Sequence, residues 1–241
     1  MSTRSGVGLA VVAVIVAIGI CVVVTPSLGH SAGSLVPAAL GEPLVLALLA
    51  AMIGRRAYRH ECLNRELRKR ARAATVDGIE VWQLTGIDGA FVAGLRRPRI
   101  FCAQHLGLDL APEEMKAVLL HERYHQLDRA PAKLVVLEAI APLVAALRLG
   151  RGWLASQIAA LEIAADRHAI AHGASRIALA SALLKVKPIS PGGVGIGFAT
   201  AAEMRLEALL DLTREGPTVL SVWFVVPLAI AAVCVMFIGL T

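Results

Sequence analysis

Residues 121–125 read His-Glu-Arg-Tyr-His and constrain this chain more than any other stretch. On a helix, residues four apart share a face, so the imidazoles of His121 and His125 can bind one zinc ion. Glu122 would lie beside that ion and act as the general base that takes a proton from a zinc-bound water. The motif therefore predicts a metallopeptidase-type zinc site. The competing interpretation is an amphipathic helix that carries two solvated histidines.

A zinc peptidase site needs a third protein ligand and leaves the fourth position for water. We predict Glu162, because it lies in a strongly helical segment and is followed by Asp166 four residues later, on the same face. Asp166 would accept a hydrogen bond from the second ring nitrogen of a zinc-bound histidine and so fix its tautomer.

Other side chains are alternatives for the third ligand. Glu138 lies in an apolar run beside Pro142, and Asp128 follows the motif closely on the same helix. His168 and His172 form a second pair four residues apart, but no glutamate follows the first of them. His168 is also a candidate catalytic residue that would stabilise an oxyanion.

The composition predicts a membrane protein. Hydrophobic residues make up 57% of the chain and aromatic residues only 4%, and the mean hydropathy is +0.69. This is too apolar for an ordinary soluble enzyme. Apolar runs at 7–24, 35–54 and 218–241 are long enough to span a bilayer, although the first is also compatible with a cleaved signal peptide. We therefore expect a transmembrane hairpin at 1–54, a zinc protease domain at 55–217 and a C-terminal transmembrane helix at 218–241.

Charge predicts the orientation of these spans. Arginines and lysines cluster between residues 55 and 72, whereas residues 25–41 carry no charge. The positive-inside rule then places the protease domain in the cytoplasm of a multi-pass protein of the cell (inner or plasma) membrane. The segment 133–147 would be re-entrant, laid on the membrane or buried in the domain, because Glu162 must share a side of the membrane with the motif. The four cysteines form no C-x-x-C motif and are expected to be reduced.

Short strands are predicted before the motif helix. Residues 79–84 and 90–95 read as two strands joined by a Gly/Asp turn, and 99–102 as a third. Such a sheet could hold an extended peptide along an open edge, or it could simply pack against the helix. Pro112 is well placed to begin the motif helix. The expected fold is mainly α, with a small sheet in an α+β protease domain between transmembrane helices.

Four stretches together resemble the membrane metallopeptidases of the BlaR/MecR type, which share a gluzincin core with the HtpX-type proteases. They are residues 90–100, 113–125, 162–166 and 204–210. The resemblance implies zinc bound by His121, His125 and Glu162, Glu122 as base, and a substrate that is a transcriptional repressor or the protein itself. Those receptors also carry an extracellular beta-lactam sensor after the last span. This sequence contains none, so antibiotic sensing by the chain alone is not expected.

The resulting functional expectation is an integral membrane zinc endopeptidase that cleaves a cytoplasmic or membrane-proximal protein in regulated proteolysis or signalling. The alternatives are an HtpX-like quality-control protease and a non-catalytic zinc-binding scaffold. Expected partners are the protein substrate and the lipid bilayer, with a homodimer as an option. Direct nucleic-acid binding is not expected, because the net charge of +6 reflects the positive-inside bias. The Gly-rich stretch 188–197 would be a loop beside the site or a linker.

Overall fold

The computed structural model describes residues 35–145, 150–186, 205–206 and 208–209 of the 241-residue chain. The chain divides into two units, one formed by 52–219 and the other by 1–51 with 220–241. The predicted protease domain, 55–217, lies inside the first unit, and so do all the contacts considered below.

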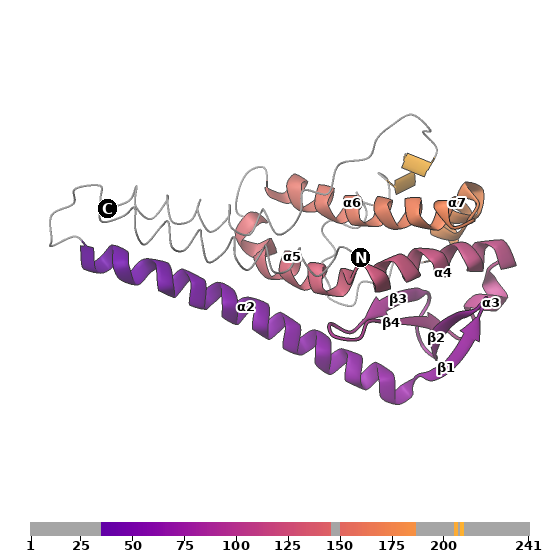
Figure 1. Cartoon of the computed structure of the whole chain (residues 1–241), viewed down its shortest axis with the longest axis horizontal. Coiled ribbons are helices and arrows are strands. Elements are labelled where there is room, and N and C mark those ends of the chain that lie inside the picture. Colours follow the sequence, from indigo (N-terminus) through magenta and orange to yellow (C-terminus); the bar gives the residue numbers. More distant parts are fainter. Residues whose placement is uncertain (1–34, 146–149, 187–204, 207, 210–241) are drawn as a thin grey trace. The chain divides into compact units, whose positions relative to one another are not determined.

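The order of elements is helical at first, then a compact run of strands, then helices (Figure 1). Helix α2 is followed by strands β1 to β4, and helices α3 to α7 follow the strands. Their bounds are α2 Leu35–Arg70, β1 Arg72–Val76, β2 Ile79–Leu84, β3 Ala90–Ala93, β4 Arg99–Ala103, α3 Leu106–Asp109, α4 Pro112–Leu127, α5 Ala130–Ala145, α6 Gly150–Ala171 and α7 Arg176–Lys185.

The four strands form one mixed sheet in the order β1-β2-β4-β3. β1 and β2 are an antiparallel hairpin closed by Asp77 and Gly78, which have φ angles of 49° and 75°. Positive φ at both central residues is the conformation that an Asp-Gly hairpin turn favours. β2 pairs parallel with β4, and β3 pairs antiparallel with β4. The strands predicted at 79–84 and 90–95 follow one another along the chain, but they do not pair as a hairpin, because β4 lies between them in the sheet.

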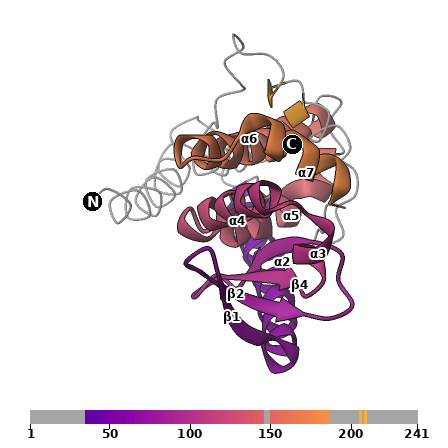
Figure 2. The ribbon, with the colours of Figure 1, turned by 90° about the vertical axis from the view of Figure 1, so that its right-hand side faces the viewer.

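Both faces of β4 are buried, which explains why this strand is almost continuously apolar. Ile100 and Cys102 belong to a core that also contains Met115 and Leu119 of α4. Phe101 points the other way, into a second core that Leu67 of α2 partly covers. Figure 2 shows α4 stacked over the sheet, with α6 and α7 beyond it. The motif helix thus lies in the middle layer, between the sheet and the outer helices.

Helix α4 begins where the sequence predicts. Pro112 is its first residue, and Glu114 in the first turn accepts a hydrogen bond from the backbone N–H of Ala111 at 2.8 Å. The same carboxylate accepts hydrogen bonds from Ser181 and Lys185 of α7. A single buried carboxylate therefore caps α4 and fastens α7 to it.

The apolar run predicted at 133–147 contributes to α5. Leu137, Ala139 and Ile140 are each at most 3% exposed, and α5 packs against α6 and α4. Of the predicted alternatives, the structure shows a helix buried in the domain. Glu138 is also buried and lies 3.1 Å from His60 Nε2 of α2, so its charge faces a polar partner.

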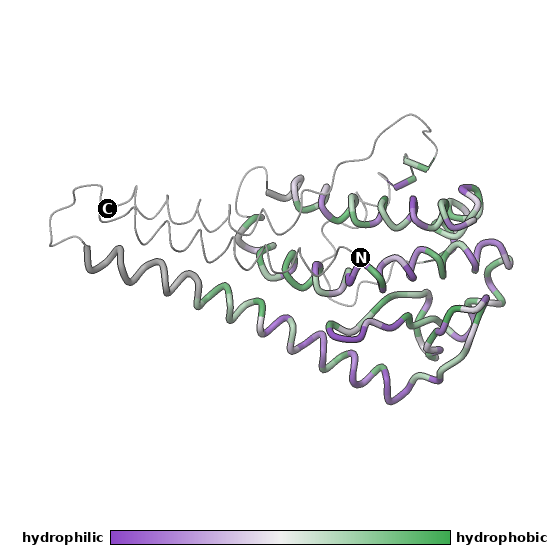
Figure 3. The backbone as a smooth tube through the Cα atoms, viewed as in Figure 1, coloured by the Kyte–Doolittle hydropathy of each residue, from purple (hydrophilic) through white to green (hydrophobic). Residues whose placement is uncertain are grey.

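The prediction of a mainly α integral membrane protein of the cell membrane needs correction. The described residues form an α+β fold with a small mixed sheet, and no helix among them has both the length and the apolar character needed to cross a membrane. Residues 35–54 belong to α2, which also carries Glu42, Pro43 and an arginine-rich second half. Figure 3 colours that second half mainly hydrophilic. The predicted spans 7–24 and 218–241 and the Gly-rich stretch 188–197 lie outside the described residues.

Candidate metal centre

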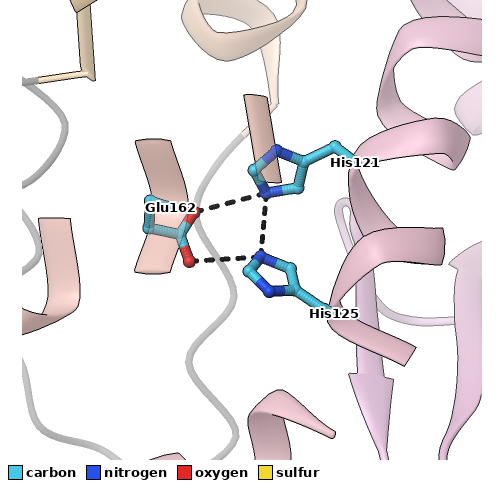
Figure 4. A group of neighbouring side chains, drawn as sticks. All are labelled: His121, His125 and Glu162. Atoms are coloured by element: carbon cyan, nitrogen blue, oxygen red, sulfur yellow. Dashed lines mark hydrogen bonds and ion pairs between the residues drawn. The ribbon is translucent and has the colours of Figure 1, made fainter. Parts of the chain in front are cut away.

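Three side chains from two helices converge on one point. His121 and His125 extend from α4 and Glu162 from α6, and Figure 4 shows all three facing one another. The two Nε2 atoms are 3.0 Å apart. Glu162 Oε2 is 3.3 Å from His121 Nε2, and Oε1 is 3.4 Å from His125 Nε2. The predicted ligand set is thus brought together across the α4/α6 interface and could hold a metal ion.

These separations fit a tetrahedral ion. Zinc bonds to nitrogen and oxygen are about 2.0–2.1 Å long, and at the tetrahedral angle they place ligand atoms about 3.3–3.4 Å apart. The observed 3.3 and 3.4 Å match this spacing, and the 3.0 Å between the two Nε2 atoms is slightly shorter. Two imidazole nitrogens and a carboxylate form a common protein donor set for zinc. Two unprotonated imidazole nitrogens facing a carboxylate also repel one another unless a cation or a proton lies between them.

Asp166 fixes one imidazole in the form that a metal requires. His121 Nδ1 is 2.8 Å from Asp166 Oδ1, and both side chains are buried. An ionised carboxylate only accepts, so Nδ1 carries the proton and donates it. Nε2 then points into the ligand cluster, where its lone pair can bind a metal ion that replaces any proton on this nitrogen. The role predicted for Asp166 agrees with this geometry. The other histidine has no such partner, because His125 Nδ1 is buried without a hydrogen bond among the described residues.

Arg205 joins the centre from far along the chain. Its Nε and one terminal nitrogen lie 2.9 and 2.8 Å from the two oxygens of Asp166, and its other terminal nitrogen is 2.9 Å from Glu162 Oε2. Its side chain is 14% exposed. Sequence reasoning gave this residue no role, although residues 204–210 contributed to the family resemblance. The only signal was the similarity of this segment to an arginine-containing helix late in the domain of those metallopeptidases.

Buried charges shift the ionisation of the cluster. Burial and Arg205 lower the pKa of His121, but Asp166 and Glu162 outweigh them and raise it to about 10. Burial also opposes ionisation of Glu162, yet the charge of His125, hydrogen bonds from both histidines and Arg205 hold the pKa of that carboxyl well below its usual range. The Asp166 and Glu162 carboxylates therefore favour a positive charge on or beside His121, which a proton or a metal ion could supply.

Glu122 lies beside the ligands and is only 9% exposed. Burial, with a further contribution from the Glu162 charge, raises its pKa despite the opposing effect of the histidines. A carboxylate whose pKa is raised toward neutrality is a better general base for water than an exposed one. Glu122 also helps burial to raise the pKa of the Cys102 thiol on β4 to about 11, which indicates that it lies near the sheet.

The remaining predicted residues lie elsewhere. The His168 ring packs against Tyr124 at 5.1 Å and stacks on His172 at 3.8 Å between ring centroids. It does not belong to the cluster of possible ligands. Asp128 forms an ion pair with Lys133 at 2.6 Å.

Comparisons with protein-family models, curated proteins and solved structures gave no match to this chain. The assignment of the centre therefore depends on its own geometry.

Proposed function

We propose that the chain is a zinc-dependent endopeptidase with its active site at the α4/α6 interface. The observation that supports this most is the combination of three convergent ligand atoms with a buried glutamate directly after the first histidine. His121, His125 and Glu162 would hold the zinc, and Asp166 would orient His121.

A zinc ion held there would polarise the scissile carbonyl and lower the pKa of a bound water to about 7. The protein's own contribution is Glu122, which would take a proton at its carboxylate and later deliver it to the leaving amine. Burial of Glu122 excludes competing water and keeps this proton transfer local. Asp166 keeps one proton of His121 on Nδ1, so Nε2 is the ring nitrogen that would face the zinc.

The substrate would bind as an extended peptide along β3. β3 is the last strand of the sheet and packs against α4. The outer edge of a terminal strand can pair with an added extended peptide of any sequence, which suits a protein substrate. A peptide added there would pass beside the helix that carries His121 and Glu122.

The family resemblance suggests regulated proteolysis, with a transcriptional repressor or the chain itself as substrate. An HtpX-like role in removing damaged proteins uses the same chemistry and is the alternative. A non-catalytic zinc scaffold is less well supported, because a structural zinc site has no use for a buried base such as Glu122.

Glu122→Gln tests the proposal. The variant keeps the size of the side chain but cannot accept the proton, so it should bind zinc with unchanged stoichiometry and lose cleavage of unfolded casein and of the chain itself. Glu113→Gln is the matched control, since Glu113 is an exposed glutamate on the same helix, and it should cleave normally. Equal cleavage by wild type and Glu122→Gln, or no zinc bound to the wild type, would reject the proposed peptidase function.

A further inference from the structure

We propose that Arg205 is a positioning residue that holds Glu162 and Asp166 in the geometry required for metal binding. This inference rests on the proposed zinc site, but it concerns a residue that contacts the outer side of that site. The guanidinium lies within 2.9 Å of both oxygens of Asp166 and of one oxygen of Glu162.

The contacts match the shape of the arginine side chain. A guanidinium is a planar fork, and its Nε and one terminal nitrogen bind the two oxygens of Asp166 as a bidentate pair. This pairing fixes the plane of the carboxylate. Asp166 Oδ1 therefore stays in place to accept the proton of His121 Nδ1. A lysine would supply the charge but not the fork.

The balance of charge also favours a guanidinium beside Glu162 and Asp166, on the side away from the metal position. Glu122, Glu162 and Asp166 bring three carboxylates into a mostly buried region. A divalent ion and one guanidinium together balance these three charges. Without Arg205, Glu162 and Asp166 would face each other one helical turn apart with no fixed counter-charge, and at least one would turn away or share a proton.

Arg205 is itself anchored by a neighbouring residue. Leu209 lies four residues later and is 7% exposed, in a core with Ala117 of α4 and Ala169 of α6. Residues 205, 206, 208 and 209 are helical, so Arg205 and Leu209 share a face. The same two helices that carry the ligands thus receive the segment that carries the guanidinium.

The test is zinc affinity, measured by chelator competition on the full chain. Arg205→Ala should bind zinc about 10–100-fold more weakly, the usual effect of removing a partner of a metal ligand. Arg205→Lys should bind zinc almost as weakly as Arg205→Ala. Arg167→Ala is the matched control, because Arg167 is exposed and directly follows Asp166; it should bind zinc like the wild type. Leu209→Ala should weaken binding in the same direction by loosening the anchor.

Two further readouts separate positioning from a loss of folding. Cobalt bound to wild type should give the intense visible absorption of a four-coordinate ion, and Arg205→Ala should change its shape or intensity while the far-ultraviolet circular dichroism stays the same. Added guanidinium ion at low concentration should restore zinc affinity to Arg205→Ala but have no effect on Arg167→Ala.

The outcomes are distinguishable from failure of the proposed function. If the wild type binds no zinc, the zinc site itself is rejected. If the wild type binds zinc and folded Arg205→Ala binds it equally well or more tightly, only the positioning role is overturned. Full recovery in Arg205→Lys would also overturn it, because charge alone would then suffice.

Discussion

Two histidine pairs with the same spacing behave differently in this protein. His121 and His125 are buried, with ring centroids 4.7 Å apart and ring planes at 82°. His168 and His172 lie toward the C-terminal end of α6, where the rings stack at 3.8 Å with planes at 30° and His172 is exposed. Nearly perpendicular rings with Nε2 atoms 3.0 Å apart direct their lone pairs to a shared point. Stacked rings keep theirs in nearly parallel planes.

The difference comes from what each pair faces. The first pair faces α6, which supplies Glu162 as a third donor and Asp166 to fix a tautomer. In the second pair, His172 Nδ1 donates to the backbone oxygen of His168 at 2.7 Å, across the C-terminal end of α6. Spacing along a helix therefore aligns two imidazoles, but a second element has to complete a metal site.

The largest expected effect is on zinc affinity, when first one histidine pair and then the other is replaced. His121→Ala or His125→Ala removes one of three protein ligands and should lower zinc affinity by more than about 100-fold, beyond the effect of losing an outer partner. The double variant of His168 and His172 to Ala should leave affinity unchanged. Chelator competition measures both. Equal losses for the two pairs would break the comparison.

Asp166→Asn should have the next largest effect. The amide keeps the size of the side chain but loses the charge that holds His121 Nδ1–H and pairs with Arg205. Zinc affinity should fall by about 10–100-fold. Asp128→Asn is the matched control, because Asp128 pairs with Lys133 away from the ligands. Wild-type zinc affinity in Asp166→Asn would show that Asp166 does not contribute to metal binding.

Glu114→Gln should change stability but not zinc affinity. Hydrogen bonds from Lys185, Ser181 and the backbone of Ala111 lower the pKa of Glu114 to about 2 from its ordinary 4.5. A carboxyl with a lowered folded-state pKa stabilises the fold above pH 4.5, and this contribution is lost as the pH falls toward 2. The metal-free wild type should thus have a higher melting temperature than the variant at neutral pH. The difference between the two melting temperatures should shrink as the pH approaches the folded-state pKa. A difference in melting temperature that grows as the pH falls would contradict this prediction.

The smallest effect concerns titration of the second pair. Burial, and then the charge of His172, lower the pKa of His168 below its ordinary 6.5. His172→Gln should therefore raise the pKa of His168 part of the way back, since burial remains. Proton NMR of the imidazole resonances follows the change. A pKa of His168 above 6.5 in the wild type would show that the pair is held by an acidic partner instead.

Local patterns predicted the centre better than they predicted the sheet. The spacing of His121 and His125, and of Glu162 and Asp166, determines which side chains share a helix face, and the structure brings these faces together. The strand order depends on contacts between distant segments, so β4 was not expected between its neighbours. β1 was missed although Asp77-Gly78 is a strong hairpin signal.

Two features could not be predicted from local sequence: the contacts of Arg205 and the environment of the apolar run at 133–147. Arg205 reaches Asp166 across 39 positions of sequence, and no local pattern indicates that contact. The apolar run at 133–147 was compatible with both a bilayer and a protein core. The structure uses much of it as the buried face of α5, where Leu137 is 2% exposed.

The most direct test is anomalous X-ray diffraction at the zinc absorption edge from crystals grown with stoichiometric zinc. The predicted result is one strong peak bounded by Nε2 of His121, Nε2 of His125 and the carboxylate of Glu162, about 2.0–2.1 Å from each ligand atom. A peak at His168 and His172, or no peak between α4 and α6, would contradict the assignment of the metal centre.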